Sequence, residues 1–473
     1  MASATELEKN AVGFWGIVFL AVSAIFPAGA YLISSSTAIT YTGETAPLAY
    51  LIAGISIFSA VVAIYVFSNH ISSAGGYYKY VEGATQNKYL SKSVGFWHIF
   101  YVLGASPILV SLVVPWLLYV ALNTLFGITI PLGIILVLIL LVPAVDFIVG
   151  YFGIKLTAKY AISTGVAQLL IFVVLAAILT FHTHFNSLSY FSFSSNSHGF
   201  SGFFLAFLIG GYLAYAGYGT VVSYGEEAKF SKQNLKKAIV TALLIMVAFD
   251  TFIVYAITAA AGPNLSTADA FFAPGLYITK QYLGLSVAFA TFILVVFFQL
   301  ASPIVFGNSV SRTVFSLARD GLLPKSLSKV HPKYKSPANA VIFVTVVTIV
   351  IAYATFIPMI LLYGLSNGLF YSWVLWGTVS VIFTLLIHAV ANETLPFLLH
   401  RLKLKINFAT HIILPLISTI LFGFAIYYGL SGLTGFLALT YILIPLWLIL
   451  SVVFIAIKGN KLTVEPLEQL MRR

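Results

Sequence analysis

The residues of this sequence that could bind a solute are helix breakers inside two long apolar stretches. Residues 26–30 include Pro27 and Gly29, and residues 210–219 include Gly217. Proline removes an amide donor and clashes with the preceding turn, so a helix that reaches Pro27 should be interrupted there. Unpaired backbone at membrane depth is tolerated only where it lines a cavity, so the two breaks predict a site between them. The alternative is that both only kink the helices or let neighbouring helices approach closely.

The backbone groups freed by such breaks would suit a zwitterion. Amide groups near residues 29–31 would form a positive helix end for a carboxylate, and carbonyl groups at residues 23–26 and 213–216 would face an ammonium group. Neither break contains a charged side chain, which favours a zwitterion over a polyamine or an anion. The tyrosines beside the second break could line the pocket or serve as ordinary packing residues. The predicted substrate-binding residues are Ala28, Gly29, Ala30, Tyr31, Tyr215, Ala216, Gly217 and Tyr218.

A few ionisable side chains fall inside the apolar stretches or at their ends. Asp250 lies near the middle of one stretch, where a carboxylate is costly unless it is protonated, paired or beside a cavity. It is therefore a candidate for ion coupling, or a protonated group bonded to a neighbouring helix. His98 is a second candidate for proton transfer. Glu226 and Glu227 form either part of an ion-paired gate or a solvated helix end. The basic partners considered for this gate are Lys79, Arg312 and Arg319.

The composition indicates that membrane helices carry these residues. Of the 473 residues, 60% are hydrophobic and 8% are charged, so lipid rather than water must be the solvent. At roughly 20 residues for each span, the chain accommodates about twelve transmembrane helices. We expect one all-α integral membrane domain over residues 1–473. The predicted spans are 13–39, 46–68, 94–123, 130–150, 157–181, 201–224, 237–261, 283–310, 338–357, 361–390, 409–430 and 434–457.

The loops between the predicted spans divide into basic and non-basic ones. Of the 24 Lys and Arg residues, only Lys280 falls in a loop predicted to lie outside the cell. The positive-inside rule then predicts a multi-pass protein of the plasma membrane with both termini in the cytoplasm. The formal charge of +11 would face lipid headgroups. A nucleic-acid partner is disfavoured because no basic segment is interleaved with an aromatic stacking platform. The chain has no cysteine, which excludes disulfides and thiol chemistry.

The chain also resembles the amino acid/polyamine/organocation (APC) superfamily of secondary transporters. At the first break only the central glycine of the family pattern, Gly29, is kept. Residues 73–81 (Ser-Ala-Gly-Gly-Tyr-Tyr-Lys-Tyr-Val) resemble the family's signature after the second helix. Residues 204–227 are similar to its sixth helix, and residues 311–324 to its segment after the eighth helix.

The resemblance implies a LeuT-like fold, and the two breaks, five spans apart, agree with two inverted five-helix repeats. The repeats would cover residues 13–181 and 201–390, followed by two C-terminal helices at 409–457. The family's lysine position in the fifth helix falls on Gln168, which argues against lysine-based proton coupling. Its ion site in the eighth helix falls near Ser302, which offers one hydroxyl group. We expect no cofactor and no metal site, and either a proton or sodium as the coupling ion.

These observations favour a secondary active transporter over three other classes. A channel would need a polar pore stripe or a filter loop, and a membrane enzyme would need clustered ionisable residues at one face. A nutrient sensor would usually need a longer partner-binding tail. We expect a permease for neutral amino acids that works by alternating access, with amino-acid exchange or transport of a polyamine or other organic cation as alternatives. The expected partners are the amino acid and the lipid bilayer, with the protein a monomer or a homodimer.

Overall fold

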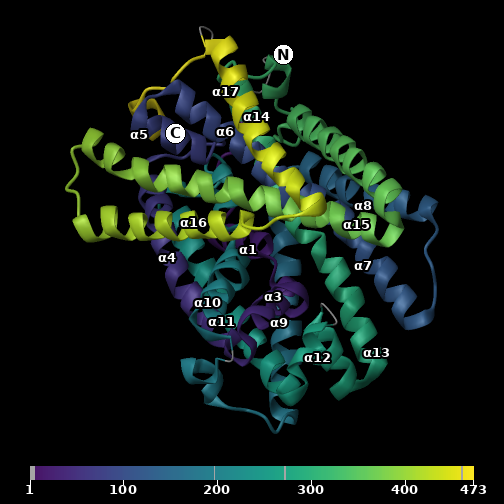
Figure 1. Cartoon of the computed structure of the whole chain (residues 1–473). Helices are drawn as coiled ribbons and strands as arrows, with labels where there is room; N and C mark the ends of the chain where they lie inside the picture. The colour runs from purple at the N-terminus through teal and green to yellow at the C-terminus, as the bar shows by residue number, and fades with distance from the viewer. Residues whose placement is uncertain (1–5, 197, 271–272, 460–461, 473) are drawn as a thin grey trace.

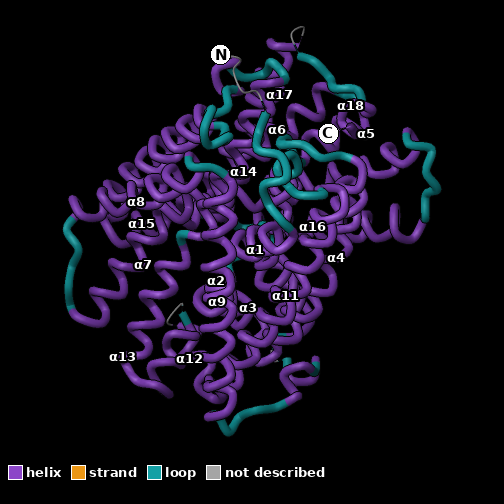
Figure 2. Tube along the Cα trace, turned by 180° about the vertical axis from the view of Figure 1, so that it is seen from behind, coloured by secondary structure: helices purple, strands orange, loops and turns teal. Residues whose placement is uncertain are grey.

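The computed structural model describes residues 6–196, 198–270, 273–459 and 462–472, and within these ranges the chain is almost entirely helical (Figures 1 and 2). Ten helical stretches are long and apolar enough to cross a membrane, and the shorter apolar stretch Phe14–Gly29 accompanies them. The prediction of an all-α integral membrane protein is therefore confirmed. Together with Phe14–Gly29, the ten stretches hold the twelve expected spans, because Ala338–Arg401 contains two of them.

The first predicted span is a broken helix. Its parts are α1 (Phe14–Ile25), α2 (Pro27–Gly29), η1 (Ala30–Ser34) and α3 (Ser35–Thr42). Pro27 explains the restart, because a missing amide hydrogen and a fixed φ suit the first position of a helix. A tight turn at Gly43, which has a φ of 62°, then leads into α4 (Ala46–His70).

The other membrane helices mostly follow the predicted spans. They are α6 (Lys88–Leu103), η3 (Gly104–Ile108), α7 (Leu109–Phe126), α8 (Leu132–Tyr151), α9 (Ile154–His182), α10 (Gly199–Leu205), η6 (Ala206–Tyr212), η7 (Leu213–Tyr215), η8 (Tyr218–Tyr224), α11 (Ser231–Ala261), α13 (Pro274–Gln299), α14 (Ala301–Arg319), α15 (Ala338–Arg401), α16 (Leu414–Leu430) and α17 (Thr440–Lys458). The connecting segments contain η2 (Gly43–Thr45), α5 (Tyr77–Thr85), η4 (Leu188–Phe191), η5 (Phe193–Ser195), η9 (Gly262–Asn264), α12 (Leu265–Ala270), η10 (Lys325–Ser328), η11 (Ala409–Ile413), η12 (Gly435–Leu439) and α18 (Leu467–Arg472).

The predicted loop between residues 357 and 361 is wrong, because these residues are helical within α15. The chain bends instead at Gly364, whose φ of 76° and ψ of 172° are not helical. A Cβ atom on Gly368 would lie 2.7 Å from the Cα atom of Ile360. Residues eight apart in a straight helix would be about 12 Å apart at a rise of 1.5 Å per residue. α15 therefore folds back at Gly364 and supplies two spans.

The predicted start of the eighth span at residue 283 lies next to a break in α13, but the residues before it are helical rather than a loop, because α13 already begins at Pro274. Gly284 interrupts α13 with a φ of 84° and a ψ of 170°. Hydropathy located the apolar part after Gly284 but assigned the less apolar turns before it to a loop.

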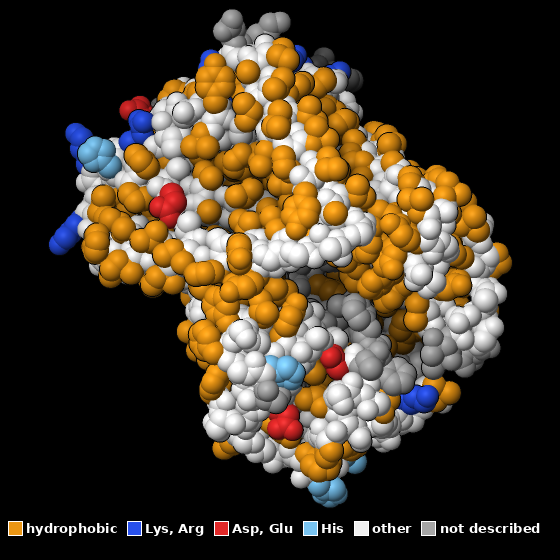
Figure 3. Space-filling view, viewed as in Figure 1, with side chains coloured by type: hydrophobic (Ala, Val, Ile, Leu, Met, Phe, Trp, Pro, Cys, Tyr) orange, Lys and Arg blue, Asp and Glu red, His pale blue; other side chains and the backbone are white. Residues whose placement is uncertain are grey.

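Apolar side chains cover most of the face shown in Figure 3, and charged side chains on it are few. Leu361 is 79% exposed and Ile457 is 77% exposed. Exposed apolar area of this extent needs lipid as its solvent. The protein is therefore a multi-pass membrane protein.

Both chain ends lie at the same end of the molecule, beside α5 and α18 (Figures 1 and 2). We call this end the termini face, and it comprises residues 6–13, 71–93, 225–233, 312–337, 459 and 462–472. The N-terminal segment joins it through an isolated β-bridge between Val12 and Ala228. Neither α5 nor α18 was predicted, because each is too short and too polar to stand out by hydropathy.

Candidate functional site

The first break leaves three carbonyl groups without their usual helical donors. Phe26 has a φ of 66° and a ψ of 79°, which ends α1. The carbonyl of Ser23 has no donor four residues later, because Pro27 carries no amide hydrogen. The amide of Ala28 donates to Oε1 of Gln168 at 3.3 Å instead of to Ala24. The amide of Gly29 donates to the carbonyl of Phe26 at 2.9 Å instead of to Ile25.

The expected free amide groups at residues 29 and 30 are absent from the described structure, which corrects that prediction. Besides the Gly29 bond to Phe26, the amide of Ala30 donates to the carbonyl of Pro27. Gly29 itself has helical dihedral angles, with a φ of −64° and a ψ of −37°. The outer part of the helix thus restarts tightly at Pro27, before the predicted residues 29–31.

The second break lies where the sequence placed it. Ala216 has an extended ψ of 149°, and Gly217 has a φ of 112°. A Cβ atom on Gly217 would lie 2.8 Å from the carbonyl oxygen of Ala24 and 3.3 Å from the amide nitrogen of Ile25. The two breaks are therefore in direct backbone contact. Phe26 and Ala216 keep partial exposure there, while most of their neighbours are buried.

The predicted aromatic residues are held by neighbouring helices. The hydroxyl group of Tyr31 shares a hydrogen bond with Thr279 of α13. The hydroxyl group of Tyr215 donates to the carbonyl of Tyr50 on α4 at 3.2 Å. The ring of Tyr218 lies 5.5 Å from the imidazole of His388. These contacts give each ring a packing role, and a substrate contact for any of them stays a prediction.

Asp250 and Gln168 are buried polar groups close to the breaks. Within the described part of the chain, Oδ1 of Asp250 makes no hydrogen bond, and neither does Nε2 of Gln168. The phenol groups of Tyr50 and Tyr215 lie within electrostatic range of the Asp250 carboxyl group. Both side chains therefore have bonding capacity left for a proton, water or substrate.

His98 and Ser302 are each occupied by a neighbouring hydroxyl group. Nδ1 of His98 lies 2.9 Å from the hydroxyl oxygen of Thr313. The hydroxyl groups of Ser302 and Ser106 share a hydrogen bond of 2.8 Å. The resemblance placed an ion site near Ser302, but this bond uses part of the capacity of its one hydroxyl group.

Glu226 and Glu227 form ion pairs across the termini face. Glu226 accepts from both terminal nitrogens of Arg319, at 2.5 and 3.0 Å, and from the amide of Ala74 at 3.1 Å. Glu227 and Arg312 form a two-bond pair in which both side chains are buried. Of the three basic partners considered from the sequence, the structure uses Arg312 and Arg319.

The Glu227 pair is embedded in further contacts. Arg312 also donates to the carbonyl and side-chain oxygens of Asn308, at 2.9 and 3.0 Å. The backbone carbonyl of Glu227 accepts from the amides of Ala11 and Val12, at 2.8 and 3.1 Å. Burial raises the pKa of Glu227 above its ordinary value, although the neighbouring Arg312 opposes this shift. The pair therefore locks the segment after η8 to both α14 and the N-terminal segment.

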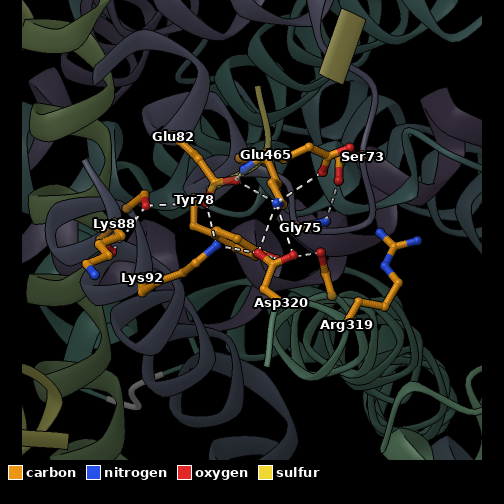
Figure 4. Close-up of polar contacts among 12 residues, drawn as sticks. Ser73, Gly75, Tyr78, Glu82, Lys88, Lys92, Arg319, Asp320 and Glu465 are labelled. Carbon is orange, nitrogen blue, oxygen red and sulfur yellow. Dashed lines mark hydrogen bonds and ion pairs between the residues drawn. The ribbon is translucent and has the colours of Figure 1, made fainter. Parts of the chain in front are cut away.

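A second charge cluster on the termini face was not anticipated from the sequence. It consists of Lys79, Lys92, Glu82, Asp320 and Glu465, and Figure 4 shows the three acidic residues and Lys92 pointing toward one another. Nζ of Lys79 lies 2.7 Å from Glu82, 2.9 Å from Asp320 and 3.3 Å from Glu465. Lys92 pairs with Glu82 and Asp320. Four chain segments therefore meet at these five side chains.

Lys79 and Asp320 keep their charges despite burial. Burial alone lowers the pKa of Lys79, but the carboxylates of Asp320 and Glu82 outweigh it and hold the pKa above its ordinary value. Burial alone raises the pKa of Asp320, but Lys79 and Lys92 together hold it below 3.8. The sequence did contain one signal, because Glu82 follows Lys79 at helical spacing beside the Ser-Ala-Gly-Gly motif.

The geometry can be set beside known proteins. The family model described as Amino acid permease matches residues 12–458. The branched-chain amino acid permease BcaP of Bacillus subtilis is 23% identical over 376 residues, which are 72% of this chain and 75% of that protein. Uncharacterized transporters of Mycobacterium bovis and Mycobacterium tuberculosis are each 30% identical over 149 residues, so the match spans only 32% of their length. These relatives are transporters rather than enzymes. Since the family match covers residues 12–458, including both breaks, this chain belongs to the amino acid permease family.

Proposed function

We propose that this protein is a secondary active transporter that carries a neutral amino acid across the plasma membrane by alternating access. The observation that carries this proposal is the backbone contact between the two breaks, at Gly217 and at Ala24. Beside that contact the carbonyl groups of residues 23–25 lack their usual helical donors. Carbonyl dipoles of this kind can replace the water around an ammonium group without a formal charge.

The carboxylate of the substrate needs donors other than the amides first expected. The unbonded Nε2 group of Gln168 is one such donor, and the Oε1 atom of the same side chain bonds to Ala28 at the first break. A neutral amide donor can bind the carboxylate of a zwitterion without repelling its ammonium group. This arrangement supports a neutral amino acid over a polyamine, whose second ammonium group would need an acidic partner at the breaks.

We assign the termini face to the cytoplasm, because the basic loops lie on it and the positive-inside rule places such loops in the cytoplasm. The ion pairs of Glu226 and Glu227 would then close the inner path in the conformation described here. Both would have to open for the substrate to leave toward the cytoplasm.

A proton is the coupling ion that the polar groups favour. Asp250 is a buried carboxyl group with bonding capacity left, whereas Ser302 offers a hydroxyl group that already bonds to Ser106. A carboxyl group can take up and release a proton during each transport cycle. Sodium is the competing outcome of the experiment.

The test is uptake of radiolabelled amino acids into proteoliposomes under an imposed proton or sodium gradient. The panel includes leucine, isoleucine and valine because the relative BcaP is named for branched-chain amino acids, together with basic amino acids and a polyamine. We expect saturable uptake of at least one neutral amino acid that increases with the proton gradient. Uptake only into preloaded vesicles would mean obligatory exchange, and uptake of the polyamine alone would refute the zwitterion assignment.

A further inference from the structure

The C-terminal segment, residues 462–472, is bonded to α5 through both side chain and backbone. Oε2 of Glu465 lies 3.3 Å from Nζ of Lys79. The amide of Glu465 donates to Oε1 of Glu82 at 3.0 Å, and its carbonyl accepts from Nε2 of Gln86 at 3.4 Å. One residue of the tail thus contacts two residues of α5 and Gln86 just after this helix, inside the charge cluster shown in Figure 4.

Apolar contacts hold the same segment against the same helix. Leu470 is fully buried although it lies within the last residues of the described chain. A Cβ atom on Gly83 would lie 3.3 Å from Cδ1 of Leu467 and 3.6 Å from Cδ1 of Leu470. A side chain larger than that of glycine would therefore press on the docked α18. The segment is a packed element rather than a loose tail.

The far end of the segment reaches a different helix. Nζ of Lys232, at the start of α11, donates to the backbone carbonyl of Met471. The segment consequently bridges α5 and the start of α11. We call residues 462–472 the clasp.

α5 connects the clasp to the second break. Tyr77 is the first residue of α5, and a Cβ atom on Gly219 would lie 1.7 Å from its hydroxyl oxygen. That hydroxyl group also shares a hydrogen bond of 2.9 Å with Nε2 of His388 on α15. Since Gly219 follows Gly217 by two residues, a shift of α5 would move Tyr77 against the broken helix. These packed contacts form a continuous physical path from residue 465 to the break.

We propose that the clasp holds the termini face closed and must release α5 before this face can open. The inference rests on the proposed alternating-access function, and it adds a regulatory role for a segment outside the membrane helices. Glu465 and Leu470 are among the residues that carry the docking contacts.

The test uses a single cysteine as a reporter of opening, because the natural chain has none. Val222 is fully buried beside the second break, and its side chain faces Gly76 on the termini face. A V222C chain in detergent is labelled with a maleimide, and the labelling rate reports how often this path opens. The rate is compared with that of the same chain carrying Glu465→Gln, or lacking residues 462–473. The matched control is Glu468→Gln, which removes the same charge from an exposed position three residues later in the clasp.

We expect Glu465→Gln to speed labelling by about three- to tenfold, since a partly buried charged contact has that effect on an equilibrium. The truncated chain should be labelled at least as fast, and Glu468→Gln should not differ from the parent. Equal labelling rates in all variants would refute the proposed role of the clasp. An equal increase in the Glu468→Gln control would refute it as well. If truncation reduces the amount of folded protein on size-exclusion chromatography, the Glu465→Gln comparison decides.

Labelling does not depend on the substrate, so failure of the two proposals can be separated. Unchanged labelling together with normal amino-acid uptake would refute the proposed role of the clasp and leave the proposed transport function intact. Faster labelling in a chain that takes up no amino acid under any gradient would keep the clasp as a conformational device and refute the proposed function.

Discussion

Replacing Gly217 by alanine tests whether the contact between the two breaks is required for transport. Gly217 has a φ of 112°, a backbone conformation that side-chain-bearing residues rarely adopt. The added Cβ atom would lie 2.8 Å from the carbonyl oxygen of Ala24 and 3.0 Å from its carbonyl carbon. Both atoms belong to the backbone, so no flexible side chain can move aside to relieve the contact.

The magnitude follows from two costs that act together. A non-glycine residue in a sparsely populated backbone region costs on the order of 1–3 kcal/mol. The close contact adds to this, because relieving it requires α1 to move away from the second break. A total of about 2–3 kcal/mol corresponds to roughly a 30- to 150-fold loss in the population of the conformation in which the breaks touch.

The assay is the initial rate of uptake of the best substrate into proteoliposomes, with the amount of folded protein measured for each variant. We expect Gly217→Ala to lose at least about tenfold in uptake. The matched control is Gly423→Ala on α16, where a Cβ atom would meet nothing within 4 Å. It should transport like the parent, since alanine is tolerated in an exposed helix. Uptake by Gly217→Ala within twofold of the control would refute the assignment of the site.

Three further outcomes follow from the buried charges. Asp250→Asn should abolish the increase in uptake caused by a proton gradient while retaining exchange into preloaded vesicles, and a gradient response that survives would exclude Asp250 as the coupling group. Glu227→Gln should lower thermal stability by about 3–5 kcal/mol, because it leaves the charge of Arg312 buried beside a neutral partner; an unchanged melting temperature would contradict the buried pair. Because the pKa of Asp320 lies below its ordinary value of 3.8, its stabilising effect is complete above that pH and is lost only as the pH falls through the lowered pKa. The difference in melting temperature between the parent and Asp320→Asn should therefore stay constant from about pH 5 to pH 9, and its disappearance between these values would be inconsistent with that pKa.

The positions of the spans and of both breaks could be predicted because they depend on local chemistry. Long apolar runs separated by polar loops set the spans, and Pro27 and Gly217 interrupt helices for reasons contained in the residues themselves. The bend at Gly364 was missed because the loop was predicted at residues 357–361, whereas α15 stays helical through Pro358 and turns back at Gly364.

The bonding at the site could not be predicted in the same way. Whether the amide of Ala28 is free depends on Gln168, which lies 140 residues away in the sequence. The charge cluster likewise joins Lys79 to Asp320 and Glu465, and no local pattern relates these positions. Such contacts are set by how helices pack, and a single sequence contains no record of that packing.

The β-bridge between Val12 and Ala228 has a mechanical consequence. The amides of Ala11 and Val12 and the carbonyl of Val12 tie the start of α1 to the segment that follows η8. The inner portions of the two broken helices are thereby fastened together at their ends as well as in contact at Gly217. The two inner portions should therefore tilt together about the breaks as one rigid body.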